Sequence, residues 1–217
     1  VIGAGAHRLS EIAGRVGQPA TALSRPLVRL QDLDFVVRET PFGDPDRGTK
    51  RALYKLADPF LTLWFSLVAP KRSAWARLPR AGRLRLFDAA FPRLVSLTWE
   101  SLCRRAVPHL GSRLRAEYGA AARSWSSGNN EWDVVAQAVD GSALLIGEAK
   151  WAHGEATPAS LQRAIQTLIA KGVPPIRRDA SAAVQYVLFV SRRPKGKLPL
   201  PDNVAVLDAR DVMGALT

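Results

Sequence analysis

The sequence predicts an α/β (α+β) protein in two parts: a winged helix-turn-helix domain over residues 1–70 and a mixed-sheet α/β sandwich over residues 84–217, joined by a basic linker over 71–83. Three observations support this prediction. Two helical patterns precede two short β-rich runs near the N-terminus, residues 71–83 are basic and contain Pro79 and Gly82, and β-rich runs alternate with helical patterns after residue 84. A chain of 217 residues, 47% of them hydrophobic, is long enough to bury two cores.

The first two helices are predicted from apolar residues at steps of three and four. The run LSEIAGRVG begins at Leu9 and ends at Gly17, a residue that commonly stops a helix. A second run has leucines at positions 23, 27, 30 and 33 and predicts an amphipathic helix. Pro26 removes a backbone donor from that helix, so Ser24 is a candidate N-cap for a shortened version of it.

Two short strands are expected next, over 35–39 and 51–56, with a loop rich in Pro, Gly and Asp between them. Helix, turn, helix and hairpin together describe a winged helix, which commonly places its second helix in the DNA major groove and its loop against phosphate. The same fold also serves as a protein-docking module, and that alternative stays open. The candidate nucleic-acid contacts are Ser24, Arg25 and Arg29 on the second helix and Arg47, Lys50 and Arg51 in the loop.

Asp58 is expected to cap a further helix that ends at Pro70. Its aromatic and aliphatic stripe, from Phe60 to Val68, predicts packing in a core or between domains.

The second part predicts the order αββαβ(β)α of a mixed α/β sandwich. A helical pair is expected over 84–90 and 93–107, on either side of Pro92. Two β-rich runs, WDVVAQAV and ALLIGEAKW, flank the turn Asp140-Gly141 and predict a hairpin. A helix over 159–171, strands over 183–191 and 204–207 and a terminal helix complete the order.

Charge and composition narrow the function classes. The formal net charge is +12, and residues 71–123 hold twelve basic and three acidic side chains, a candidate footprint for a phosphate backbone or an arginine-rich solvated surface. Cys103 is the single cysteine and excludes an internal disulfide or a multi-cysteine zinc site, which favours the cytoplasm. The apolar run at 60–69 is shorter than the roughly 18 residues of a membrane span. The start without Met suggests a piece of a longer protein.

Acidic and basic residues on the predicted hairpin carry the candidate chemistry. Asp133 and Glu148 fall on its two strands, and Lys150 shares a face with Glu148 because side chains alternate along a strand. Two carboxylates offer the hard oxygen ligands that Mg²⁺ or Mn²⁺ requires, while the lysine can orient water or stabilise phosphoryl charge. Glu100 lies alone in an apolar helical run and is a candidate third acid. We therefore predict catalytic roles for all four residues, with the three acids as metal ligands.

Another reading of the same residues is an ion pair on an exposed sheet face, worth about 0–1 kcal/mol. Trp132 and Trp151 flank the motif and are expected to be packing residues. Of the three histidines only His153 follows closely enough to reach the site.

The string NNEWDVVA followed by LLIGEAKW resembles the PD-(D/E)xK nuclease superfamily, and more closely the C-terminal region of a family of archaeal and bacterial AAA/STAND-type ATPases. Members of that family carry a P-loop ATPase, a winged helix and then a nuclease-like domain. EIAGRVG, FVVRE and LYKLADPFLTLWFSLVAP are similar to the winged-helix portion, so the resemblance covers nearly the whole chain.

The resemblance implies a restriction-endonuclease-like fold and a role for individual residues. Asp133 matches the metal-binding Asp, Glu148 the (D/E) and Lys150 the Lys, while Glu100 takes the place of an acid on the first core helix. Gln162 or Gln166 takes the place of a polar residue on the following helix. The Pro before the Asp is absent, with Trp132 in its place.

The resemblance also implies partners and cofactors: DNA, Mg²⁺ or Mn²⁺, ATP only through an upstream ATPase domain, and a possible oligomer. The expected function is a DNA-binding module with a metal-dependent phosphodiesterase site. The alternative is a catalytically inactive DNA-binding module that regulates the upstream ATPase.

Overall fold

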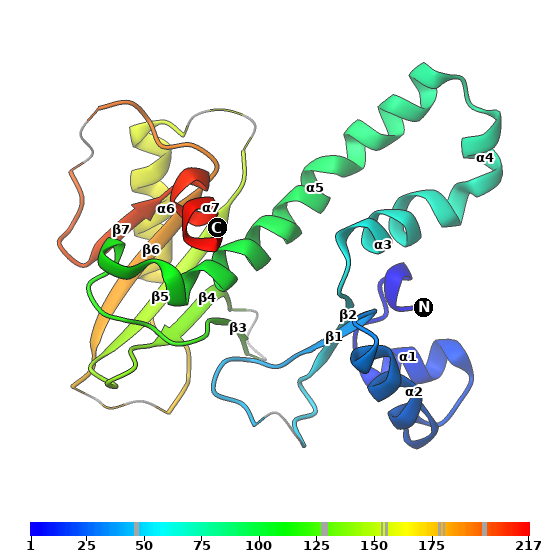
Figure 1. Ribbon diagram of the computed structural model, residues 1–217, viewed down its shortest axis with the longest axis horizontal. Coiled ribbons are helices and arrows are strands. Elements are labelled where there is room, and N and C mark those ends of the chain that lie inside the picture. The colour runs from blue at the N-terminus through cyan, green and yellow to red at the C-terminus, as the bar shows by residue number, and fades with distance from the viewer. Residues whose placement is uncertain are drawn as a thin grey trace. The chain divides into compact units, whose positions relative to one another are not determined.

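The computed structural model describes residues 1–45, 48–126, 130–152, 154, 156–177, 179, 181–196 and 199–217. It is a mixed α/β structure (Figure 1). The chain divides into two compact units, residues 1–40 with 44–95 and residues 41–43 with 96–217.

The first unit begins with two helices in the predicted places. α1 spans Leu9–Val16 and ends at Gly17, whose φ of 71° is the left-handed conformation that glycine adopts at low cost. α2 spans Ala20–Asp32, with Pro19 as its N-cap. Ser24 is therefore inside the helix, not its cap, and Pro26 is accommodated in the helix interior.

A two-stranded antiparallel sheet follows. β1, Val36–Glu39, pairs with β2, Leu53–Leu56, so that Val36 faces Leu56 and Glu39 faces Leu53. The predicted strands are confirmed to within two residues at each end. The core of this unit is formed by Ile2, Ala6, Ile12, Leu23, Leu27 and Val36.

The predicted cap at Asp58 is confirmed, because its carboxylate accepts hydrogen bonds from the amides of Phe60 and Leu61. The predicted helix is α-helical only in its first part, α3, which spans Pro59–Leu63. A π-helical segment, Trp64–Val68, continues it. Within the first unit the aromatic stripe is only partly buried, since Phe60 is 64% exposed, Phe65 is 44% exposed and Trp64 is half-buried. Packing of the stripe between domains stays a prediction.

Residues 71–83, the predicted basic linker, are largely helical. α4 spans Arg72–Arg77, and α5 spans Arg80–Ala106 as one helix that contains Pro92, in place of the predicted pair. A proline inside a helix removes one backbone hydrogen bond but need not end it. The compact units divide between residues 95 and 96, whereas the boundaries of the predicted domains at 70 and 84 stay a prediction.

The second unit is built on a five-stranded sheet in the order β3-β4-β5-β6-β7. β4, Glu131–Gln137, and β5, Ala143–Lys150, form the predicted antiparallel hairpin. β6, Ala183–Val190, and β7, Val204–Leu207, extend the sheet in parallel. β3, Ala122–Trp125, pairs antiparallel with β4 and was not predicted.

Helices cover both faces of this sheet, as the predicted sandwich requires. The end of α5 and α7, Ala209–Leu216, share one core with the sheet, to which Trp99, Cys103, Val134, Phe189 and Val212 belong. α6, Pro158–Ala170, shares the other core, to which Trp132, Ile146, Leu161, Ile165 and Leu188 belong. Odd and even positions of β5 therefore face different helices.

Gly147 lies where β4, β5 and β6 pack most closely. A Cβ atom at this position would lie 2.7 Å from Val187 Cγ1 and 3.0 Å from Val134 Cβ. Only glycine fits without a shift of neighbouring strands, so the residue directly before Glu148 is fixed by packing.

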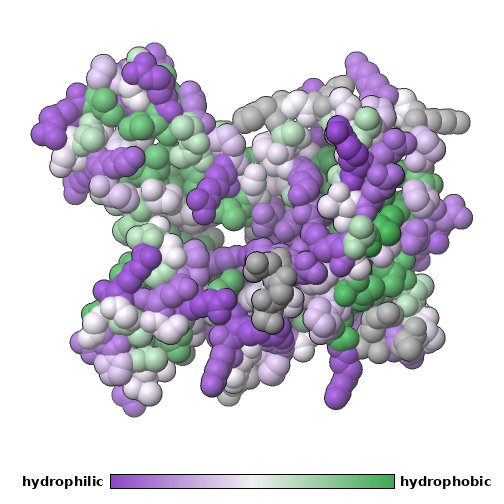
Figure 2. Space-filling view, turned by 180° about the vertical axis from the view of Figure 1, so that it is seen from behind, coloured by the Kyte–Doolittle hydropathy of each residue, from purple (hydrophilic) through white to green (hydrophobic). Residues whose placement is uncertain are grey.

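In both units some large apolar side chains remain exposed, including those of Leu84 and Met213. Hydrophobic areas interrupt the hydrophilic surface in Figure 2. Within the described ranges, every helix is too short or too polar to cross a membrane.

Candidate functional site

Asp133 and Glu148 lie beside each other at one end of the β4–β5 pair. Val134 pairs with Gly147, and Asp133 and Glu148 are the next residues outward on the two strands. Asp133 Oδ2 accepts a hydrogen bond of 3.0 Å from the amide of Ala149, which ties the carboxylate to β5. The backbone register therefore places the two residues that carry these carboxylates next to each other.

The main chain at Asp133 also contacts β3 and α5. The register of β3 with β4 shifts between Ala122 and Ser124, opposite the segment of β4 that contains Asp133. Arg104 on α5 donates a hydrogen bond of 2.9 Å from Nη1 to the carbonyl oxygen of Asp133. A helix and the neighbouring strand thus fix the backbone that carries this carboxylate.

Glu148 is held by two lysines. Its Oε1 lies 2.7 Å from Lys150 Nζ and its Oε2 lies 2.7 Å from Lys171 Nζ. Lys171, just after α6, also donates to the carbonyl oxygen of Glu131 at 2.8 Å. The bond from Lys171 is partly buried, since its side chain is 20% exposed and that of Glu148 is 15% exposed, whereas the bond from Lys150 lies at the surface.

The two carboxylates differ in proton affinity. Burial raises the pKa of Asp133, and the charge of Glu148 raises it further, against smaller opposing effects that include the Ala149 amide. Burial also raises the pKa of Glu148, but the hydrogen bonds and charges of Lys150 and Lys171 outweigh burial and leave that pKa below its ordinary value.

Lys150 lies in the field of all three candidate acids. Burial lowers the pKa of Lys150, but the hydrogen bond to Glu148 and the charges of Glu148, Asp133 and Glu100 together raise it above the ordinary value. Lys150 is therefore a cation under neutral conditions, and 57% of its side chain is exposed. A charged and reachable ammonium beside two carboxylates can contact a bound phosphoryl group.

Glu100, the predicted third acid, lies on α5. Its Oε2 lies 3.9 Å from Arg104 Nη1, and its side chain is 19% exposed. Among the described residues, no three His, Cys, Asp or Glu side chains are placed to hold a metal ion. The described residues therefore form no common set of three ligands, and a metal-ligand role for Glu100 stays a prediction.

A pair of carboxylates is nevertheless a donor set that suits Mg²⁺ or Mn²⁺. Mg²⁺ commonly binds through one or two carboxylates and keeps several waters. Burial and the neighbouring negative charge raise the pKa of Asp133, and a cation beside it would relieve both effects. Asp133 and Glu148 are thus the residues that would hold such a cation, which would have to replace a lysine at Glu148.

Lys171 is the site residue that sequence reasoning missed. Lys171 directly follows α6, the helix on which Gln162 or Gln166 was the expected polar site residue. Both glutamines are exposed on α6. Lys171 reaches Glu148 because the last turn of α6 ends beside the start of β4. The sequence contains no spacing rule that links residue 171 to residue 148, since the two meet only through helix packing.

The aromatic neighbours of the motif are packing residues, as predicted. Trp132 is 2% exposed, and its indole Nε1 donates to the carbonyl oxygen of Gly172 at 3.1 Å. Trp151 packs edge-on against Trp99, with ring centroids 5.5 Å apart. His153 lies outside the described residues.

The candidate nucleic-acid contacts of the first unit differ in exposure and in their ion pairs. Ser24, Arg25 and Arg29 are exposed on α2, and Lys50 is exposed before β2. Arg51, in contrast, is bound to Asp44 through Nε at 2.9 Å and through Nη2. Arg47 lies outside the described residues.

Comparison with known proteins gives one finding. Residues 64–163 match the family model DUF234, described as archaeal and bacterial proteins of unknown function. The matched range contains Glu100, Asp133, Glu148 and Lys150. No curated protein and no solved structure matches the chain.

Proposed function

We propose that the chain is a DNA-binding module whose second unit is a metal-dependent phosphodiesterase of the PD-(D/E)xK type. The observation that carries the proposal is the placement of Asp133 and Glu148 side by side on β4 and β5, with the Lys150 ammonium 2.7 Å from Glu148. The resemblance of the hairpin sequence to PD-(D/E)xK nucleases assigns the same three residues to catalysis.

In this proposal Asp133 and Glu148 hold Mg²⁺ or Mn²⁺. The bound cation would supply Lewis-acid stabilisation of the charge on the phosphoryl group. Lys150 would orient the attacking water and stabilise the same charge, and its cationic, exposed ammonium supports that role. Glu100 acts at longer range, through its effect on Lys150.

The first unit supplies DNA contacts in this proposal. α1, α2 and the β1–β2 hairpin follow the order of a winged helix, and α2 exposes Arg25 and Arg29 on its surface. Phosphate contacts by such side chains fix the position of a protein on a duplex. The implied upstream ATPase domain and an oligomeric state belong to the same proposal.

A second function is favoured by one specific observation. Both carboxylate oxygens of Glu148 are bound to lysine ammoniums, so a cation has to displace at least one of them. A module that keeps these ion pairs would bind DNA and regulate an attached ATPase without cutting.

Cleavage of plasmid DNA separates the two functions. We expect the full chain to cut in Mn²⁺ or Mg²⁺ and to stop in EDTA, and Lys150→Met to lower the rate by roughly 10²–10³, as for other groups that stabilise transition-state charge. Lys195→Met, at an exposed loop lysine, is the matched control and should cut like the parent. Binding without cleavage by the parent chain would select the regulatory function.

A further inference from the structure

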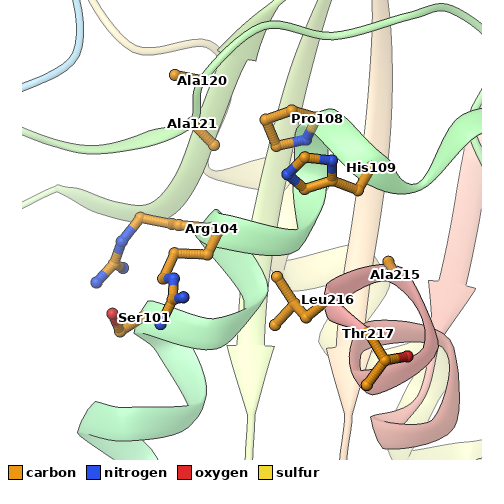
Figure 3. A pocket seen from close by; sticks show the side chains of 10 residues that line it. Ser101, Arg104, Pro108, His109, Ala120, Ala121, Ala215, Leu216 and Thr217 are labelled. Carbon is orange, nitrogen blue, oxygen red and sulfur yellow. The ribbon is translucent and has the colours of Figure 1, made fainter.

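An open pocket of about 710 Å³ lies on the α5 side of the second unit. Ser101, Arg104, Arg105 and Pro108 recur at helical steps and so line it from one face of α5 and the turn that follows. Ala120 and Ala121 line another side, and α7 contributes its last residues. Figure 3 shows the basic and hydroxyl side chains gathered around this hollow together with His109.

The side chains that line the pocket include two arginines and a histidine, beside the main-chain carboxyl group of Thr217. Within the described part of the chain, none of the side chains that line it is acidic. Arg104 is engaged with Asp133 and Glu100, but Arg105 and His109 are exposed, and their side chains form no hydrogen bond or ion pair with any described residue. A guanidinium in this state presents a planar set of donors that matches phosphate oxygens.

Arg104 connects the pocket to the proposed catalytic site. Its guanidinium lines the pocket and donates to the carbonyl oxygen of Asp133 at 2.9 Å. The pocket therefore lies one side chain away from the main chain of Asp133. The small side chains of Ala120 and Ala121 leave room for a sugar-phosphate backbone beside the helix.

We propose that this pocket binds a phosphodiester of the same DNA strand that the proposed function places at Asp133 and Glu148. Arg105 is the main phosphate contact, and His109 and Ser101 supply further polar contacts. The inference rests on the proposed nuclease-like function and extends it, because it gives the bound strand a path along α5.

The test measures DNA binding by the full chain in EDTA. Fluorescence anisotropy of a labelled single strand reports the affinity between about 50 and 200 mM salt. We expect the double variant Arg105→Ala/His109→Ala to bind severalfold more weakly than the parent. The slope of log K against log salt should become shallower by about 0.7 for each phosphate that the variant no longer neutralises. Arg163→Ala, at an exposed arginine of α6 on the other face of the sheet, is the control and should match the parent.

The outcomes are distinguishable. If the parent binds DNA and the double variant keeps its affinity and salt slope, the pocket proposal is overturned, while the nuclease-like proposal stands. If the double variant binds weakly but the parent never cuts, the pocket stands as a DNA-binding surface and the catalytic proposal fails. A parent chain that does not bind DNA at low salt overturns both. Circular dichroism of both variants verifies that they are folded.

Discussion

The second unit contains two charged clusters of the same composition, two carboxylates beside two basic side chains. The site cluster consists of Asp133, Glu148, Lys150 and Lys171, and the α7 cluster consists of Asp208, Asp211, Arg113 and Arg193. In the α7 cluster, arginine binds both carboxylates, at distances of 3.1–3.2 Å. In the site cluster both lysines bind Glu148, and among the described residues no basic side chain forms an ion pair with Asp133.

This difference separates a structural cluster from a candidate functional one. Asp208 also caps α7 by accepting hydrogen bonds from the amides of Arg210 and Asp211. Burial raises the pKa of Asp208, but the hydrogen bond from Arg193 and these amides outweigh burial and hold it below the ordinary value. The pKa of Asp133 lies above the ordinary value, since its burial and its negative neighbour are not offset. Carboxylates with perturbed pKa values concentrate at functional sites.

The largest effect on stability is expected for Glu148→Gln. The substitution removes the charge that two ammoniums bind, and hydrogen bonds to charged groups contribute roughly 1.5–3 kcal/mol each. Lys150 is more than half exposed, so we expect a total loss near the lower end, about 1.5–2 kcal/mol at neutral pH by urea unfolding.

The pH dependence of that loss provides its control. Because the folded-state pKa of Glu148 is lowered, its stabilisation is present above the ordinary carboxyl pKa and disappears as the pH falls through the folded value. The parent and Glu148→Gln should therefore approach the same stability in acid. An equal gap at all pH values would show that the ion pairs contribute nothing.

A smaller loss is expected for Asp208→Ala, which removes the N-cap of α7. Loss of an aspartate cap typically costs about 1 kcal/mol, and the exposed ion pair with Arg193 adds little. Thermal unfolding should show the decrease, and Asp202→Ala, at an exposed loop aspartate, should not. DNA cleavage by Asp208→Ala should equal that of the parent.

The smallest effect, with the opposite sign, is expected for Asp133→Asn. Because the folded-state pKa of Asp133 is raised, its ionisation destabilises the folded chain as the pH rises above the ordinary carboxyl pKa. The amide should therefore increase neutral-pH stability by on the order of 0.5 kcal/mol. Urea unfolding would contradict the comparison if Asp133→Asn lost as much stability as Glu148→Gln.

Much of the second unit could be predicted from sequence because its signals are local. The β4–β5 hairpin has the Asp140-Gly141 turn between two β-rich runs, and Gly141 adopts a φ of 76° in the structure. Period two along β5 placed Glu148 and Lys150 on one face, where they form an ion pair. Asp133 and Glu148 could be aligned because the hairpin fixes their register.

What could not be predicted depends on contacts between distant segments. β3 is short and finds its place only by pairing with β4, and Lys171 reaches Glu148 only because α6 packs on the sheet. Pro79, Gly82 and Pro92 suggested breaks, yet Pro92 lies within α5. The packing of the aromatic stripe at residues 60–68 was predicted from its composition alone, and composition does not identify the surface against which a helix packs.

The decisive measurement for the central claim is Mn²⁺ binding by the metal-free full chain. Electron paramagnetic resonance detects the Mn²⁺ that remains free in solution. The claim is that Asp133 and Glu148 together form a cation site, whereas the α7 cluster does not. We predict that the parent and Asp208→Ala take up Mn²⁺, and that Asp133→Asn and Glu148→Gln do not. Uptake that is absent from the parent, or equal in Asp133→Asn, would contradict the account.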